Sequence, residues 1–171
     1  LDAHLPRPAV INGSLATDGS FMRLSADVPE VTLNDNRFEA LSLSARSDGN
    51  RLSLLAKACR PLRDAALQVE LHTTAKNGEW SNNLQWDERR HHSFYGNILT
   101  TGQFRIPTLG SERRVQFDFD LRPTTFHING NTWDIEPGNI ALTDREFAIR
   151  HVALRHADQH LTVHGTYTRG G

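Results

Sequence analysis

Apolar and polar residues alternate along most of this chain. The clearest run is RVQFDFDLR, in which Val115, Phe117, Phe119 and Leu121 alternate with charged and polar residues. A period of two is that of a β-strand, and strands with one apolar and one polar face are typical of antiparallel sheets. The same alternation recurs in residues 20–28, 51–58, 66–74 and 160–168. Helical periodicity is nearly absent, so the pattern predicts an all-β chain.

Short segments rich in Asn, Asp and Gly separate these runs. Such residues tolerate positive φ and fit tight hairpin turns. They are TDGS (17–20), NDNR (34–37), SDGN (47–50) and KNGE (76–79). The spacing between turns predicts roughly ten to twelve strands. The segment ACRPLRDAALQ (58–68) leaves two interpretations open, a short helical turn around Asp64 or a corner at Pro61.

Two interruptions of the alternation predict bends. Ile149 and Val152 fall on opposite parities, and so do Leu121 and Phe126 on either side of Pro123. Bulges or bends at 150–151 and at Pro123 would restore one continuous inner face. Several strands also carry small and polar residues where a closed sandwich or barrel has bulky apolar ones. A long, curved antiparallel meander fits this pattern better than a compact closed fold.

Composition and charge exclude several classes of function. The chain has 171 residues, 37% of them hydrophobic and 23% charged, with a mean hydropathy of -0.51 and a formal net charge of -1. That length fits one domain or one section of a longer protein. The chain shows no basic stripe of the kind that predicts nucleic-acid binding. No apolar run approaches the roughly 18 residues that a membrane span needs. The lone Cys59 has no internal partner for a disulfide.

Candidate chemistry along the chain is sparse. Trp133 in NTWDIEPGN is interpreted as a corner residue covering the edge of the core, and a carbohydrate-stacking platform with Asp134 and Glu136 is the weaker alternative. Four histidines lie in HVALRHADQHLTVH (151–164), but His156 and His160 straddle a turn, so surface positions are expected instead of a metal site. We expect no catalytic residues, no enzyme activity, no metal and no cofactor.

Two long segments carry a family resemblance. They are LSADVPEVTLNDNRFEALSLSARSDGNRLSLLA (24–56) and TFHINGNTWDIEPGNIALTDREFAIRHVALRHADQHLTVHGTYT (125–168). Both resemble the TamB-like proteins of Gram-negative bacteria, which belong to the AsmA-like superfamily of bridge-like lipid-transfer proteins. LQWDERRHHSFYGNI (84–98) also resembles the strand–turn–strand that precedes the second segment. The ordered series, more than any single motif, carries the likeness.

The resemblance implies a fold and a location. TamB-like proteins are anchored in the inner membrane and cross the periplasm as a U-shaped, half-open β-taco whose hydrophobic concave groove is open along one side. Residues 1–171 would form a single section of that body, with the membrane anchor outside the sequence. The implied roles are phospholipid transfer towards the outer membrane and the assembly of outer-membrane proteins. The implied partners are phospholipids or other acyl-chain ligands and, through regions outside the chain, a BamA-like or TamA-like barrel.

The expected groove lining follows from the alternation. An inner face of aliphatic and phenylalanine side chains suits acyl chains, because burying them is worth about 0.8 kcal/mol per methylene. The open first and last strands of such a section also favour edge-to-edge self-association. The predicted lining residues are Met22, Leu24, Leu52, Leu54, Leu67, Val69, Leu71, Val115, Phe117, Phe119, Leu121, Phe126, Ile128, Phe147, Ile149, Leu161 and Val163.

A binding module of another class is the main alternative. In that interpretation the chain is an ordinary β-sandwich or jelly roll that recognises glycan or protein. Trp80, Trp86 and Trp133 would then be the candidate anchors. Closure of the sheet around a dry core, together with exposed and aligned tryptophans, would favour this alternative over a lipid-binding section.

Overall fold

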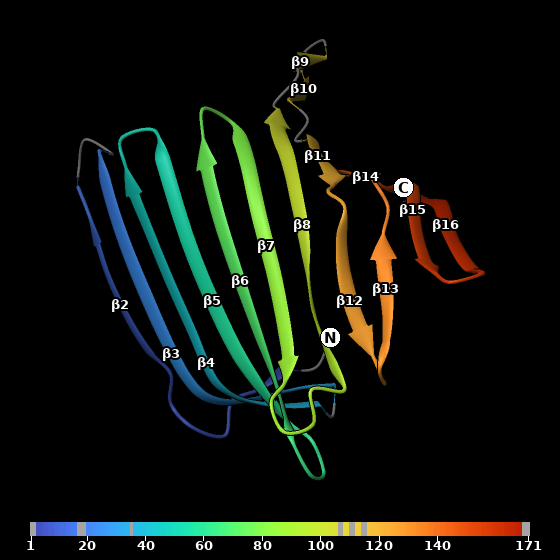
Figure 1. Ribbon diagram of the computed structural model, residues 1–171. Coiled ribbons are helices and arrows are strands. Elements are labelled where there is room, and N and C mark those ends of the chain that lie inside the picture. The colour runs from blue at the N-terminus through green and yellow to red at the C-terminus, as the bar shows by residue number, and fades with distance from the viewer. Residues whose placement is uncertain are drawn as a thin grey trace.

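The chain consists of β-strands joined by turns and short loops (Figure 1). The computed structural model describes residues 3–16, 20–34, 36–105, 108–109, 112–113 and 116–168. No helix occurs among these residues, which confirms the all-β prediction, and so none of the described residues forms a helix that could cross a membrane. The strands are β1 (Ala3–His4), β2 (Val10–Leu15), β3 (Phe21–Leu33), β4 (Asn36–Asp48), β5 (Arg51–Pro61), β6 (Ala66–Lys76), β7 (Glu79–Glu88), β8 (Phe94–Arg105), β9 (Thr108–Leu109), β10 (Glu112–Arg113), β11 (Gln116–Leu121), β12 (Thr124–Ile128), β13 (Asn131–Ile135), β14 (Gly138–Thr143), β15 (Glu146–His156) and β16 (Gln159–Thr168).

One antiparallel sheet of 14 strands contains nearly the whole chain, and β9 and β10 pair separately. From β3 to β8 each strand pairs with the next in sequence, which is the predicted meander. Within the described residues, β2 pairs only with β3 and β16 only with β15, so they form open edges of the sheet. The order of the pairings places β3–β8 side by side in one broad, curved surface (Figure 1).

Strands β11 to β14 form a single long hairpin that is broken in the middle. Leu121 pairs with Gly138 and, beyond the break, Thr124 pairs with Ile135, so the register is unchanged across Pro123 and Pro137. Proline has no N–H to donate to a ladder, which explains why each long strand is interrupted there. The meander therefore continues through β11–β12 and β13–β14. These breaks, with the short strands β1, β9 and β10, make the strand count higher than the predicted ten to twelve.

Bulges occur at the positions where the alternation changes parity. On β8, three residues lie between Gly96 and Thr100, whereas four lie between their partners Leu121 and Phe126, so one extra residue lies on the β11–β12 side at Pro123. In β15 the register shifts between Ile149 and Val152. Both bends were predicted from the sequence, and both return the apolar residues to the same face.

Tight turns carry the expected residues. Asn77 and Gly78 have φ values of 54° and 80°, and Asn129 and Gly130 have 48° and 80°, which is the pattern of type I′ hairpin turns. Gly49 in SDGN likewise has a φ of 58°. The segment after Pro61 is a corner without helix, closed by a hydrogen bond of 2.9 Å from the Leu62 N–H to the Ala65 carbonyl.

Candidate functional site

Most large apolar side chains lie on one face of the sheet. Directly paired residues in an antiparallel ladder point to the same side. The pairings therefore align Met22, Leu52, Phe119 and Ile149 in one row that crosses the sheet. We call this side the apolar face. Besides residues expected from the sequence, it carries Leu43, Leu84, Trp80, Trp86, Ile98 and Ile140.

The predicted lining residues fall on the apolar face wherever they are described. Val115 lies outside the described residues, and the others share the face by register. Sequence reasoning missed Leu84 and Ile98. Leu84 has the same parity as Trp80 and Trp86, but Asn82 between them disguises the apolar pattern of β7.

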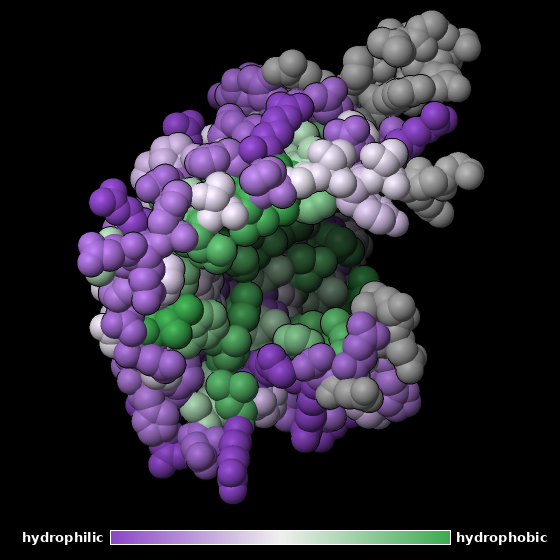
Figure 2. Space-filling model, turned by 90° about the vertical axis from the view of Figure 1, so that its right-hand side faces the viewer, coloured by the Kyte–Doolittle hydropathy of each residue, from purple (hydrophilic) through white to green (hydrophobic). Residues whose placement is uncertain are grey.

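Side chains on the apolar face are only partly covered. Leu142 and Phe147 are each 41% exposed and Leu161 is 51% exposed. Among the described residues no large side chain is fully buried, and the few buried apolar residues are mostly alanines or lie near the strand breaks. Figure 2 shows hydrophobic residues gathered inside a hollow, with hydrophilic residues on the surrounding surface. The apolar residues are thus not sealed against one another as in a closed core.

An aromatic cluster fills one end of the apolar face. Trp86 lies 5.6 Å from Phe94 and 6.1 Å from Phe126 between ring centroids, and Trp133 stacks on Phe126 at 6.4 Å. Trp133 is half-buried, but it lies in the middle of β13, where it pairs with Phe126, and not at the predicted corner. Asp134 follows it in β13 and so points to the opposite face, which separates this carboxylate from the ring and does not favour a sugar-stacking platform. Trp80 and Trp86 are also half-buried.

A row of polar side chains crosses the middle of the apolar face. The Thr73 hydroxyl donates to Asn82 Oδ1 at 2.8 Å, and Asn82 Nδ2 donates to Thr100 Oγ1 at 3.0 Å. We call these three residues the polar row. Thr73 pairs with Leu54 and Thr100 pairs with Leu121, so apolar residues flank the row at both ends. Thr73 is only 5% exposed.

The opposite face of the sheet is polar and charged. Lys57 Nζ lies 2.8 Å from Glu70 Oε2, and His72 also contacts Glu70. The hydrogen bond from Lys57, followed by that from His72, lowers the pKa of Glu70. A cavity of about 660 Å³ lies against this pair, and its lining includes Gln85 and Tyr95. Because the charges here are paired with each other, the arrangement is that of a solvated outer surface.

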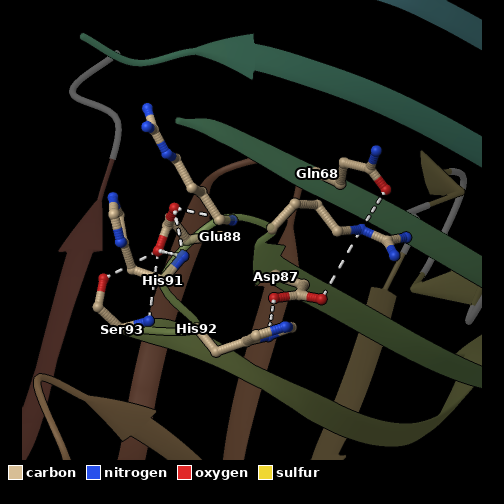
Figure 3. A network of polar contacts seen from close by, with 8 residues as sticks. Gln68, Asp87, Glu88, His91, His92 and Ser93 are labelled. Atoms are coloured by element: carbon tan, nitrogen blue, oxygen red, sulfur yellow. Dashed lines mark hydrogen bonds and ion pairs between the residues drawn. The ribbon is translucent and has the colours of Figure 1, made fainter. Parts of the chain in front are cut away.

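The turn after β7 is organised by Glu88, which is 4% exposed (Figure 3). Its carboxylate accepts hydrogen bonds from the backbone N–H groups of Arg90, His91 and Ser93 at 3.1 to 3.3 Å and from the Ser93 hydroxyl at 3.1 Å. Burial is the largest influence and acts to raise the pKa of Glu88. The hydrogen bonds together outweigh burial and leave that pKa below its usual value. Glu88 therefore acts as an anchor for the turn.

The histidine-rich segment is a surface hairpin. His156 and His160 lie on either side of the β15–β16 turn, and the His156 ring contacts the Thr132 carbonyl at 2.7 Å through Nδ1. Across the described ranges, no group of three or more His, Cys, Asp or Glu residues is placed to hold a metal ion.

Comparison with known proteins returned no relative. No family model, no curated protein and no solved structure matches the chain. The functional interpretation therefore depends on the two faces of the sheet and on the residues that they carry.

Proposed function

We propose that the apolar face binds acyl chains and that the chain is a section of a TamB-like β-taco, whose hydrophobic concave groove conducts phospholipids between the inner and outer membranes. The observation that carries the proposal is the partial exposure of aligned apolar side chains, such as Phe147 at 41% and Leu161 at 51%. Figure 2 shows hydrophobic residues gathered inside a hollow. An apolar surface of this kind rarely stays open to water in a monomeric protein unless it has an occupant.

The energetics favour a lipid tail as that occupant. Transfer of each methylene from water to an apolar surface is worth about 0.8 kcal/mol, so even partial cover of a tail offsets several kcal/mol of the cost of leaving a bilayer. The interaction is non-directional and gives little selectivity among tails. Weak selectivity suits a conduit, because apolar contacts alone give the ligand no deep minimum along its path.

The wider role follows from the resemblance and is part of the proposal. The section would lie in the periplasm, within an inner-membrane-anchored envelope protein that supports outer-membrane protein assembly. Docking to a BamA-like or TamA-like barrel would involve regions outside the chain. The meander topology supports such a role, since every pass of the sheet adds apolar positions to the same face.

Lipid binding is tested by placing a charge on the apolar face. Leu54 pairs with Ala45 and Thr73 near the middle of that face. Leu54→Arg would bury a guanidinium among apolar side chains whenever a tail binds, and we expect it to reduce bound lipid at least tenfold. The measurements are mass spectrometry of lipid that co-purifies with the chain and cross-linking to a photoreactive phospholipid. Phe117→Arg should have the same effect.

The matched control is Ser53→Arg, which adds the same charge at the next residue. Ser53 is exposed and points to the polar face, so lipid binding should stay at the wild-type level. Equal cross-linking of the wild type, Leu54→Arg and Ser53→Arg would contradict the proposal. Circular dichroism of each variant would verify that the sheet is retained.

A further inference from the structure

The polar row of Thr73, Asn82 and Thr100 lies in apolar surroundings. On one side of the polar row, the next residues on the same face are Leu71, Leu84 and Ile98. On the other side they are Ala75, Trp80 and Gly102. Apart from the indole N–H of Trp80, the hydrogen-bonding side chains that a tail meets on this part of the face are those of the polar row. A few polar groups inside an apolar site are the arrangement that fixes the position of a bound small molecule.

The polar row satisfies part of its own hydrogen-bonding capacity and leaves two donors. Thr73 donates to Asn82, and Asn82 donates to Thr100, which leaves the Thr100 hydroxyl hydrogen and the second Asn82 N–H. Turning the Asn82 amide by 180° reverses both hydrogen bonds and leaves one threonine hydroxyl hydrogen and one N–H again. In either orientation the polar row offers donors to a ligand that brings an acceptor.

We propose that the polar row binds the ester carbonyl oxygen of an acyl ligand whose tail lies on the apolar face. This inference rests on the proposed function. A carbonyl oxygen has two lone pairs and needs no acceptor in return, so it matches the two donors. A phosphate or carboxylate matches poorly, because no cationic side chain belongs to the row and desolvating a charge is costly. The polar row thus distinguishes esterified acyl chains from bare hydrocarbon.

The test compares two ligands that differ only in the carbonyl. They are 1-decanoyl-glycerol, an ester, and 1-O-decyl-glycerol, its ether counterpart, each used to displace pyrene from the purified chain. An ether oxygen is a weaker acceptor, and one added hydrogen bond is worth about 1 kcal/mol, so the wild type should bind the ester about fivefold more tightly. Pyrene has no polar group and reports on the apolar face alone.

Variants assign the preference to the polar row. The triple variant Thr73→Val, Asn82→Leu and Thr100→Val removes every member, so that no buried polar group is left without a partner. Its ester-to-ether ratio should fall to about one while pyrene affinity stays the same or rises. Asn82→Asp alone, which nearly preserves shape, replaces the amide by a carboxylate that has no N–H and accepts hydrogen bonds from both threonine hydroxyls, so it should reduce the ratio at least twofold. Thr74→Val is the matched control, because exposed Thr74 points to the opposite face, and it should keep the full ratio.

Each contrary result has a separate meaning. Equal affinity of the wild type for ester and ether, or an unchanged ratio in the triple variant and in Asn82→Asp, would overturn the inference while the proposed function stands. Failure of the folded wild type to bind pyrene would overturn the proposed function and the inference with it. If the triple variant does not fold, as judged by its thermal unfolding, the ratio measured with Asn82→Asp decides.

Discussion

The ring of Trp86 lies over Gly96, its partner across the ladder between β7 and β8. A Cβ at Gly96 would lie 3.1 Å from Trp86 Cζ2, 2.8 Å from the Phe126 Cα and in overlap with the Phe126 Cβ. The missing side chain thus lets two aromatic residues from β7 and β12, the strands on either side of β8, approach each other, with 6.1 Å between their ring centroids. Glycine is required here for close approach, since no positive φ is recorded at this position.

Gly96→Ala should destabilise the chain. The added methyl group would collide with backbone as well as side-chain atoms of Phe126, and overpacking of this kind costs about 1–3 kcal/mol. We expect a value at the upper end, measured by urea unfolding. Gly165→Ala is the matched control, because a Cβ there meets nothing within 4 Å. A similar loss of stability in both variants would argue against the packing described for Trp86.

Phe126→Ala and Phe147→Ala should differ strongly in their effect on stability. Phe126 is 9% exposed inside the aromatic cluster, and its truncation should cost about 3 kcal/mol. Phe147 lies on the same face but is 41% exposed, so its truncation should cost about 1 kcal/mol or less. Urea unfolding of the two variants measures the difference. Equal losses would mean that the face is sealed along its whole length.

The strands and the shared face could be predicted from the sequence because both follow from a period of two. The alternation in β5, β6 and β11 placed their apolar residues correctly, and the parity changes at Pro123 and at 150–151 located two bulges. A third register shift, in β4 between Glu39 and Ser42, was not predicted. The pairing of β11–β12 with β13–β14 could not be predicted, since it depends on a register conserved across two proline breaks.

The polar row and the role of Glu88 in the turn could not be predicted from the sequence for a different reason. Thr73, Asn82 and Thr100 come from three strands, and only the register aligns them. When β7 is considered alone, Asn82 only interrupts the alternation of apolar residues. In the sequence, Glu88 is one charged residue of the polar run DERRHH (87–92), and nothing there indicates that it is buried. Its burial arises from the turn that folds back over its carboxylate.

Removing the charge of Glu88 should destabilise the turn in a pH-dependent way. The pKa of Glu88 is lower in the folded chain than its ordinary value of 4.5. The carboxylate therefore contributes stability above pH 4.5, and this contribution is lost as the pH falls through the pKa of the folded chain. Glu88→Gln should therefore unfold at lower urea than the wild type at pH 7. The gap should close as pH falls below about 4.5.

Glu79→Gln serves as the matched control for this experiment. Glu79 is exposed at the start of β7, and most surface substitutions change stability by less than about 0.5 kcal/mol. A gap between the wild type and Glu88→Gln that persists unchanged to pH 3 would show that the charge of Glu88 is not what holds the turn.

The open edges of the sheet should make the chain self-associate. In β2, Ile11 is 69% exposed, and in β16, Leu161 and Val163 are 51% and 40% exposed. Within the described residues each edge strand pairs on one side only, and an unpaired edge is a template for another chain. The mass observed by sedimentation velocity should therefore rise with concentration.

Val163→Lys should weaken that association, because a charge on the apolar face of an edge strand must be desolvated when a second sheet extends the face. Thr162→Lys adds the same charge at the adjacent residue, where the side chain points to the polar face and stays hydrated after pairing, so its effect should be smaller. A wild type that keeps the mass of one chain at all concentrations would rule out edge pairing. Equal effects of the two lysines would show that general charge repulsion, and not continuity of the apolar face, governs the contact.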